Sequence, residues 1–352
     1  MSTNTTDPAH APAPPGLDLD KLRTWLSAVT PVDGPLSAHM IAGGRSNLTY
    51  RVCDSNSTWI VRRPPLGHVL STAHDMGREV TVMRALANTD VPVPAIVADC
   101  RDDAVLGAPF YVMSDVSGTP YRTTGELAVL GPDRTTAIST KMVQTLAALH
   151  QVDYTAVGLE DFGRPEGFLV RQVHRWTQQL EASRSRELDG VDELIRMLTG
   201  TEPPESVSGI VHGDYRLDNL LVDDDDEIRA VIDWEMSTLG DPVTDVALLL
   251  VYNRLAEITD SEVVADASNA AGFLDRHDTL EVYIGSGGHE PPNGFGFHLG
   301  LAYFKLAVIL EGIHYRFVNG HTVGDGYAAI GEVVEPLIRA GIDEMTDYLQ
   351  SR

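Results

Sequence analysis

The sequence is poor in cysteine, in basic residues and in aromatic residues. Its 352 residues include two cysteines, Cys53 and Cys100, which are too few for a disulfide framework, so a reducing, cytoplasmic location is expected. Only 26 lysines and arginines oppose 51 acidic residues, and the formal net charge of −25 argues against nucleic-acid binding. An aromatic content of 7% provides little material for a cage around a choline-type ammonium group.

Long hydrophobic runs are also lacking. The most apolar stretches, residues 246–252 and 299–313, are shorter than the roughly 20 residues of a spanning helix. Residues 1–16 have neither a basic start nor an apolar core, so they do not resemble a secretory signal. Their alanine, proline and threonine content predicts a disordered tail. We therefore expect no association with membranes.

A β-rich segment follows this tail. A helix is predicted at residues 17–29 and another at 74–87. Short apolar or alternating runs predict strands at residues 38–41, 48–53, 58–62, 95–99 and 110–113. Turn residues separate the first three strands, which indicates an antiparallel meander. Residues 17–115 are thus expected to form a small α+β lobe.

The periodicity of residues 116–352 is mainly helical. Helices are predicted at residues 134–150, 168–184, 191–198, 243–258, 260–275, 297–316 and 327–349. A β-hairpin of residues 219–222 and 228–233 interrupts them. A five-stranded antiparallel N-lobe followed by a larger helical C-lobe with a hairpin predicts the bilobal, protein-kinase-like α+β fold, on analogy at the level of the fold.

The strongest chemical signal is the stretch that begins His212-Gly213-Asp214. Asp214 and Asn219 have the spacing of the protein-kinase catalytic loop, in which the aspartate accepts the proton of the attacking hydroxyl and the asparagine binds Mg²⁺. Asp233, at the end of an apolar strand, corresponds to the metal-binding aspartate of the kinase D-F-G segment. Asp214 is therefore the predicted catalytic base, and Asn219 and Asp233 are the predicted Mg²⁺ ligands.

These residues carry a family resemblance. H-G-D-x-x-x-x-N followed by Ile232-Asp233-Trp234-Glu235 resembles the aminoglycoside phosphotransferase and choline kinase superfamily. Gly43-Gly44-x-x-Asn47, the run VRRPP at 61–65 and the run DWEMSTLGDPVTD at 233–245 are similar to a subgroup that includes kinase-like domains fused to acyl-CoA dehydrogenases. The resemblance runs from about residue 17 to the C-terminus. It implies an ATP- and magnesium-dependent kinase for a small-molecule hydroxyl, and does not separate ATP from GTP.

Phosphate binding in the small lobe is assigned to Arg62 and Glu79. Kinases use a lysine on the third strand, paired with a glutamate on the following helix. Arg62 stands at the lysine position, and Glu79 lies on the apolar stripe of helix 74–87, where a buried carboxylate needs a cation. Arg63 is the alternative if the strand register shifts by one residue.

The adenine and phosphate contacts of the backbone are predicted from position. Gly43, Gly44 and Asn47 lie between the first two strands, where a nucleotide flap belongs, although a plain hairpin turn explains them equally well. Met113, Ser114 and Val116 lie at the crossing between the lobes, where a hinge would hydrogen-bond adenine. Asp241 and Asp245 are expected to be structural, as an N-cap and a first-turn acid. His212 is expected to order the loop.

The acceptor is the part of the function that motifs do not specify. Its pocket is expected in the helical lobe, facing Asp214. The candidate residues are Arg171, Arg175, Trp176, Tyr303, Glu311, His314, Tyr315 and Arg316. Their several arginines favour an acidic or hydroxyacyl-CoA-linked acceptor over an aminoglycoside, which stays an alternative. The rival function is a nucleotide-binding pseudokinase scaffold, suggested by an arginine at the lysine position. The oligomeric state is not predicted.

Overall fold

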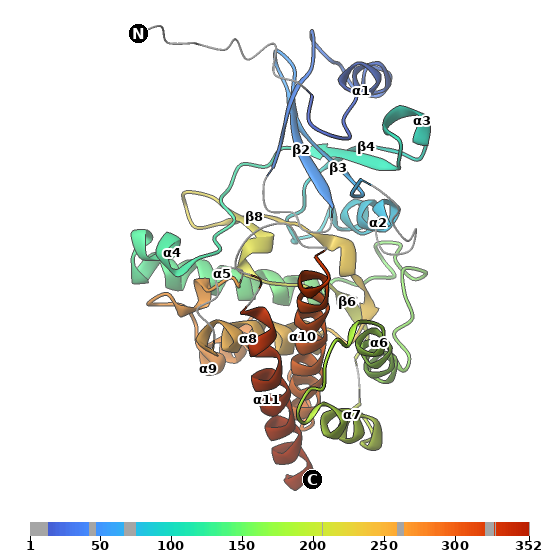
Figure 1. Cartoon of the computed structure of the whole chain (residues 1–352). Coiled ribbons are helices and arrows are strands. Elements are labelled where there is room, and N and C mark those ends of the chain that lie inside the picture. Colours follow the sequence, from blue (N-terminus) through green and yellow to red (C-terminus); the bar gives the residue numbers. More distant parts are fainter. Residues whose placement is uncertain are drawn as a thin grey trace, which may run out of the picture. The chain divides into compact units, whose positions relative to one another are not determined.

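The computed structural model describes residues 13–41, 47–66, 75–205, 207–258, 264–320, 327 and 329–351. The chain forms two compact units (Figure 1). The first consists of the residues up to Ser117 together with Ala230–Glu235, and the second of Gly118–Arg229 and the residues from Met236 onward. The short segment Ala230–Glu235 thus joins the strand-rich unit although it comes from the range that the sequence assigns to the C-lobe.

The first unit is built on a five-stranded antiparallel sheet in the order β1-β2-β3-β5-β4. Its strands are β1 (Ser37–Met40), β2 (Leu48–Cys53), β3 (Thr58–Arg63), β4 (Ile96–Cys100) and β5 (Phe110–Ser114). The register places Arg62 of β3 opposite Thr49 of β2 and Tyr111 of β5. All five predicted strands are present, and the antiparallel order confirms the predicted lobe.

Three helices complete this unit: α1 (Leu19–Leu26), α2 (Met76–Leu86) and the single turn α3 (Asp103–Leu106). Each begins after an aspartate whose carboxylate accepts a hydrogen bond from a backbone N–H of the first turn. β3 is buried from Trp59 to Arg63, which shows that both faces of this part of the strand are covered. Trp59 and Val61 belong to the apolar core with α1, and the alternation of a strand turns Arg62 to the other face.

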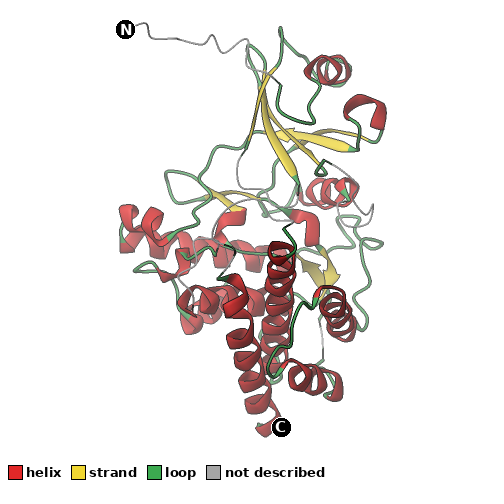
Figure 2. Ribbon diagram, viewed as in Figure 1, coloured by secondary structure: helices red, strands yellow, loops and turns green. Residues whose placement is uncertain are grey.

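The second unit is mainly helical (Figure 2). Its helices are α4 (Thr124–Leu130), α5 (Pro132–Gln151), α6 (Phe168–Ser183), α7 (Val191–Gly200), α8 (Val243–Ile258), α9 (Arg276–Gly285), α10 (Phe295–Val318) and α11 (Ile330–Gln350). α10 packs along α11 and against α6 and α8. Close approach of α10 and α11 depends on Gly300, where an added Cβ would lie 2.6 Å from Met345 Cγ.

Helix α10 is the most apolar element. By length and composition alone it could cross a membrane, but 78% of its most apolar window is buried within the protein. It is longer than the apolar run 299–313, because Phe295 and Phe297 extend it at the start. Burial on all sides is the property of a central core helix, and the part of α10 up to Gly312 fits that description.

Two small antiparallel sheets complete the fold. β6 (Gly209–Val211) pairs with β9 (Thr238–Gly240), and β7 (Leu220–Val222) pairs with β8 (Ile228–Val231) as the predicted hairpin. The 3₁₀ turns η2 (Leu217–Asn219) and η3 (Trp234–Met236) flank this hairpin. Neither α4 nor the β6–β9 pair was predicted.

One predicted helix is wrong. Of the range 260–275, the described residues from 264 form the single 3₁₀ turn η4 (Ala267–Asn269) and loops. Gly272 has a φ of +90°, which ends helical geometry there. The helix of this region is α9, and it begins at Arg276 because Asp275 caps the backbone N–H of Asp278.

Candidate active site

The loop of the second unit from His212 to Asn219 connects β6 to β7. Asp245, in the first turn of α8, anchors it: its two carboxylate oxygens accept the backbone N–H groups of His212 (2.6 Å) and Gly213 (2.8 Å). Gly213 has a φ of +85°, and an added Cβ would lie 2.8 Å from the carbonyl oxygen of Met236. The loop therefore requires glycine at this position, for its backbone angle and for its close packing.

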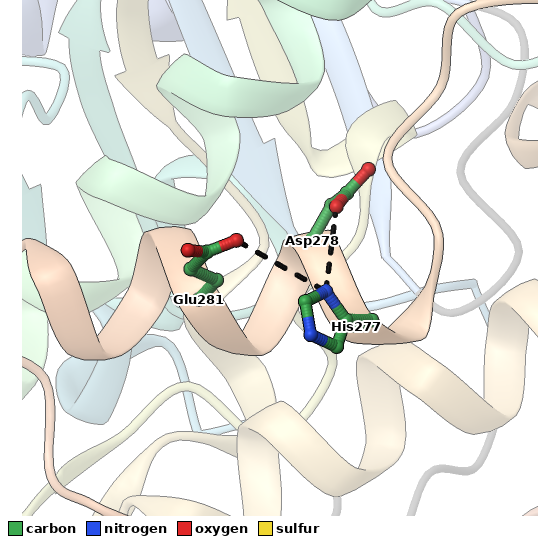
Figure 3. A group of neighbouring side chains, drawn as sticks. All are labelled: His277, Asp278 and Glu281. Atoms are coloured by element: carbon green, nitrogen blue, oxygen red, sulfur yellow. Dashed lines mark ion pairs between the residues drawn. The ribbon is translucent and has the colours of Figure 1, made fainter.

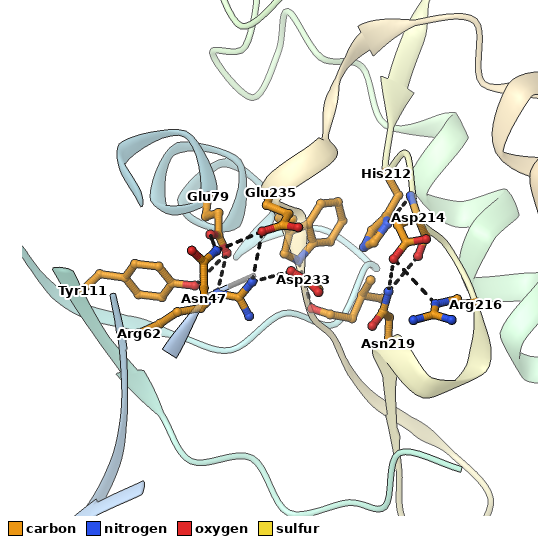
Figure 4. A network of polar contacts seen from close by, with 12 residues as sticks. Asn47, Arg62, Glu79, Tyr111, His212, Asp214, Arg216, Asn219, Asp233 and Glu235 are labelled. Atoms are coloured by element: carbon orange, nitrogen blue, oxygen red, sulfur yellow. Dashed lines mark hydrogen bonds and ion pairs between the residues drawn. The ribbon is translucent and has the colours of Figure 1, made fainter. Parts of the chain in front are cut away.

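Asp214 is held by three side chains. Its Oδ1 accepts a hydrogen bond from Tyr252 Oη (2.5 Å), and its Oδ2 accepts one from Asn219 Nδ2 (3.1 Å). Arg216 Nε lies 3.6 Å from Oδ2 (Figure 4). Burial, followed by the charge of Asp214, raises the pKa of Tyr252 well above its usual value, so this phenol stays a donor. The carboxylate is thus fixed in orientation while its side chain stays 21% exposed.

Asn219 has the geometry expected of a metal ligand. Its Nδ2 donates to the carbonyl oxygen of Asp214 (2.8 Å) as well as to the Asp214 carboxylate. Because both amide hydrogens are directed at Asp214, the amide oxygen is the atom left to bind a cation. An amide oxygen beside a carboxylate is a donor set that suits Mg²⁺.

A fully buried pair, His150 and Asp245, supports the anchor of the loop. His150 of α5 places Nε2 3.3 Å from Asp245 Oδ2 and Nδ1 2.7 Å from Tyr283 Oη. Burial lowers the pKa of His150 more than the adjacent Asp245 raises it. Burial alone would raise the pKa of Asp245, but hydrogen bonds from His150 and from the Gly213 backbone hold this pKa below its usual value. A neutral imidazole therefore donates to an ionised carboxylate.

In the first unit, Arg62 is the centre of a cluster of carboxylates (Figure 4). Its Nε lies 3.2 Å from Glu79 Oε2, and its Nη2 contacts Asp233 and lies 3.8 Å from Glu235 Oε2. Burial would lower the pKa of Arg62, but Glu79 and the other acids outweigh it and raise that pKa further, so the guanidinium stays charged. The predicted Arg62–Glu79 ion pair is present.

Glu79 is 1% exposed and receives further donors. Tyr111 Oη donates to its Oε2 (2.9 Å), and Asn47 Nδ2 lies 3.3 Å from its Oε1. Asn47 Nδ2 also donates to Glu235 Oε2 (3.0 Å). Asn47 is therefore a buried link between α2 and the segment after β8. Gly43 and Gly44, the other predicted flap residues, lie outside the described residues.

Asp233 combines charge with an unusual backbone. Its φ is +67°, a left-handed angle that aspartate tolerates better than most residues. Three carboxylates, Glu79, Asp233 and Glu235, surround the single charge of Arg62, which leaves a formal charge of 1 − 3 = −2. A divalent cation would balance this excess, and the side chain of Asp233 is 27% exposed, so the residues present fit a metal.

Arg63 faces away from this cluster. Its guanidinium donates to the carbonyl oxygens of Gly16, Leu106 (2.8 Å) and Pro64 (3.2 Å). The two arginines lie on opposite faces of β3, which favours Arg62 over Arg63 as the phosphate-binding candidate.

The predicted hinge residues lie at the end of β5 and beyond it. Met113 pairs with Ile60 of β3, and Ser114 donates its N–H to the carbonyl oxygen of Ala95 (2.9 Å). Val116 follows β5, half-buried, and within the described residues its backbone N–H makes no hydrogen bond. That donor is available to a ligand.

A small cavity of about 40 Å³ lies beside Gly213 in the second unit. Its lining is mostly apolar and includes Phe168, Gln172, Arg175, Trp176, Val211, Gly213, Met236, Thr238, Thr244, Asp245, Leu248, His298, Leu301, Ala302 and Lys305. Lys305 of α10 donates to the carbonyl oxygen of Gly213 (2.5 Å). Lys305 Nζ and Arg175 Cζ each lie 5.5 Å from the centre of a Trp176 ring.

The eight candidate residues for the acceptor are not gathered at this cavity. Trp176 lines it, whereas Arg171 donates to the carbonyl oxygens of Arg164 and Glu166. Glu311 is fully buried and accepts from Ser185 (2.7 Å) and Arg186 (3.2 Å). Tyr315 is 37% exposed and lies roughly 15 Å along the α10 axis from Lys305, at 1.5 Å per residue.

One cluster of potential metal ligands lies on the surface. Among the described residues, His277, Asp278 and Glu281 of α9 are close enough to share an ion (Figure 3). His277 Nδ1 lies 3.6 Å from Asp278 and 4.0 Å from Glu281. All three side chains are exposed and come from one helix, so they are ordinary solvated polar side chains.

Sequence reasoning missed Tyr252 and Lys305. Tyr252 lies 38 residues after Asp214, and Lys305 lies 92 residues after Gly213, each on a helix with no motif of its own. The sequence predicted that Asp245 is a first-turn acid of α8 only, whereas in the structure Asp245 also holds the backbone of the 212–219 loop. The run GDPVTD at 240–245 was the one sequence signal for this role, because it contains a carboxylate, that of Asp245, for which no partner was expected.

Comparison with known proteins gives a consistent result. The family model described as "Phosphotransferase enzyme family" matches residues 37–282. The mouse protein acyl-CoA dehydrogenase family member 10 is 33% identical over 340 residues, or 93% of this chain. The chain spans 31% of that relative's length.

Solved structures agree in fold. A crystal structure from Ralstonia eutropha JMP134, provisionally named an aminoglycoside phosphotransferase, is 33% identical, with a TM-score of 0.81 over 94% of this chain and 98% of that one. A thermostable mutant of the aminoglycoside phosphotransferase APH(4)-Ia, in a ternary complex with AMP-PNP and hygromycin B, has a TM-score of 0.59 at 15% identity, covering 88% of this chain and 95% of that one. The second likeness concerns the fold alone.

Proposed function

This chain belongs to the phosphotransferase enzyme family, and from that premise we propose that it is an ATP- and Mg²⁺-dependent kinase for a hydroxyl group of a small molecule. The observation that carries the proposal is the fixed carboxylate of Asp214, held by Tyr252 and Asn219 and still partly exposed. The APH(4)-Ia complex with AMP-PNP supports the choice of ATP. The acyl-CoA dehydrogenase relative supports a hydroxyacyl-CoA or a related hydroxy compound as acceptor.

In this proposal Asp214 is the base. A substrate hydroxyl hydrogen-bonds to the carboxylate and gives it the proton as the hydroxyl oxygen forms a bond to the γ-phosphorus. The bond from that phosphorus to the bridging oxygen breaks, and ADP leaves with the electron pair. Tyr252 and Asn219 keep the carboxylate aimed at the hydroxyl during the transfer.

Asn219 and Asp233 are the proposed Mg²⁺ ligands, through the amide oxygen of Asn219 and the carboxylate of Asp233. The ion would neutralise charge that develops on the phosphate oxygens. Arg62 is the proposed phosphate contact, with Glu79 holding its guanidinium. The backbone of Met113, Ser114 and Val116 is proposed to bind adenine.

The test is ATP consumption with a panel of hydroxyl acceptors that includes hydroxyacyl-CoAs, small alcohols and aminoglycosides. Asp214→Asn should lower acceptor-dependent turnover by about 10²- to 10⁴-fold, the usual contribution of a general base. Asp225→Asn, an exposed acid in the β7–β8 turn, is the matched control and should keep full turnover.

Full activity of Asp214→Asn would refute its role as the base. Asp233→Asn should weaken Mg²⁺-dependent nucleotide binding, measured by calorimetry. Binding of nucleotide without turnover of any acceptor would favour the pseudokinase scaffold instead.

A further inference from the structure

The cavity beside Gly213 contains a hydrogen-bond donor that lacks an acceptor. Trp176 is 5% exposed, and its Nε1 is buried with no hydrogen-bond partner among the described residues. Burying a donor unpaired costs about 1–3 kcal/mol in a protein. Such an atom in the lining of a cavity is therefore explained if a ligand supplies its acceptor. His298 Nδ1, also in the lining, is a second buried atom without a partner there.

Two cations lie over the same tryptophan. Lys305 and Arg175 are both in the lining, and within the described part of the chain neither forms an ion pair with a carboxylate. Burial lowers the pKa of Lys305, and the neighbouring Arg175 lowers it further, against the pull of Asp214 and Asp245. Lys305 is half-buried and Arg175 is exposed, so both side chains can present their charge to an anion at this point.

The one carboxylate of the cavity lining is bonded to other groups and forms no ion pair with Lys305 or Arg175 among the described residues. Asp245 directs both of its oxygens to backbone N–H groups, those of His212 and Gly213. The rest of the lining is apolar or uncharged, apart from His298, whose Nε2 lies 2.8 Å from Asp241 Oδ2. An ammonium, a guanidinium and an indole N–H at a small apolar cavity form a donor set for one oxyanion.

We propose that Lys305, Arg175 and Trp176 form a subsite for an oxyanion, a carboxylate or a phosphate, carried by the hydroxylated acceptor. The proposal rests on the proposed function. Lys305 binds the carbonyl of Gly213, whose Cα is about 3.8 Å from that of Asp214. An acceptor anchored there by its anion would therefore place a hydroxyl a few bonds away at the base. Polycationic aminoglycosides would be repelled by the same two cations.

Calorimetric binding tests the subsite without any need for turnover. The probes are 3-hydroxybutyrate, its neutral methyl ester and glycerol 3-phosphate, with the wild type and with Lys305→Met, Trp176→Phe and Lys141→Met. Lys141→Met removes one charge from an exposed ion pair on α5 and serves as the control. We expect at least one oxyanion to bind the wild type about 10-fold or more tighter than the ester.

Lys305→Met should abolish this advantage, Trp176→Phe should weaken it by roughly 3- to 10-fold, and Lys141→Met should preserve it. A preference for 3-hydroxybutyrate identifies a carboxylate subsite, and one for glycerol 3-phosphate identifies a phosphate subsite. The proposal is overturned if neither oxyanion binds better than the ester, or if Lys305→Met binds like the wild type. Charge-dependent binding without ATP turnover would leave the subsite standing and refute the kinase.

Discussion

At the scale of single residues, Arg62 and Glu79 show how a buried charge is tolerated. Glu79 is almost wholly inside the first unit, and it is balanced by the guanidinium of Arg62 and by donors from Tyr111 and Asn47. Arginine suits this position because its planar fork reaches Glu79 through one nitrogen and Asp233 through another. A lysine would have to reach both carboxylates from a single nitrogen atom, without the spread of the guanidinium.

Replacing Arg62 by methionine should therefore be costly. It leaves Glu79 buried without its cation, and the free energy of unfolding should fall by about 3–5 kcal/mol at pH 7. Urea unfolding monitored by circular dichroism measures the loss. Arg84→Met, which removes a surface ion pair with Asp99 from the same α2, should cost no more than about 1 kcal/mol.

The double variant Arg62→Met/Glu79→Gln provides a further check. Removing the second charge should restore part of the lost stability, because no unpaired carboxylate is left. Equal losses in Arg62→Met and Arg84→Met would show that the cluster is not an important source of stability.

The sequence predicts residues of the site where the chemistry is local. Asp214 and Asn219 are five residues apart on one loop, so their spacing alone brings them together, and the structure shows the hydrogen bonds between them. Tyr252 and Lys305 reach the same loop from distant helices, and their contacts depend on how α8 and α10 pack. No local pattern encodes such packing. Glu311 was predicted to contact the acceptor because it is a charged residue on an apolar helix. In the structure this buried carboxylate instead pairs with Arg186 of the same unit.

At the scale of elements, the strands followed from the sequence more reliably than the helices. The apolar runs of β2 and β3 are bounded by turn residues, and the antiparallel pairing of the two strands matches the predicted meander. The helix expected at 260–275 failed because Gly272 and the Asp275 cap moved the start of helical structure to Arg276. The start of α4 is marked in the sequence by a capping box, in which Thr123 and Glu126 each hydrogen-bond to the other's backbone, but the helix was not predicted.

The junction of α5, α8 and the β6–β7 loop should be sensitive to acid. The pKa of His150 is lower in the folded protein than in the unfolded chain, so between these two values the unfolded chain binds a proton that the folded protein does not. The stability due to neutral His150 is complete above about pH 6.5 and is lost as the pH falls below it. The depressed pKa of Asp245 has the same sign, and its contribution is lost at still lower pH, below the usual range of an aspartate.

Thermal unfolding of His150→Gln between pH 5 and pH 8 measures this effect. The variant should be less stable than the wild type at pH 8, because its bonds to Asp245 and Tyr283 are changed. Its stability should fall less steeply below pH 6.5, by up to about 1.4 kcal/mol per pH unit. His277→Gln, on the exposed face of α9, is the control and should keep the wild-type slope. A parallel pH dependence of His150→Gln and the wild type would contradict the assignment.

At the scale of the whole molecule, the excess of acidic residues is the dominant property. With a formal net charge of −25, the acidic side chains repel one another in the compact folded state, and salt screens this repulsion. The midpoint of thermal unfolding should therefore rise by a few degrees from about 10 mM to about 200 mM NaCl, since the Debye length shortens roughly from 30 Å to below 10 Å. Scanning calorimetry measures the change, and choline chloride at equal ionic strength separates screening from specific ion binding. A midpoint that falls with salt would mean that attractive ion pairs outweigh the net repulsion.

Gly213 limits how this loop can evolve. A protein kinase carries arginine between the histidine and the aspartate of the corresponding loop. Here any side chain at position 213 would meet the Met236 carbonyl and would have to adopt a left-handed backbone angle. A lineage with this loop cannot reach the arginine form by one amino-acid replacement, because the segment leading into β9 would have to move first. The glycine and arginine forms of the loop are therefore separated by coordinated changes at position 213 and in the segment around Met236.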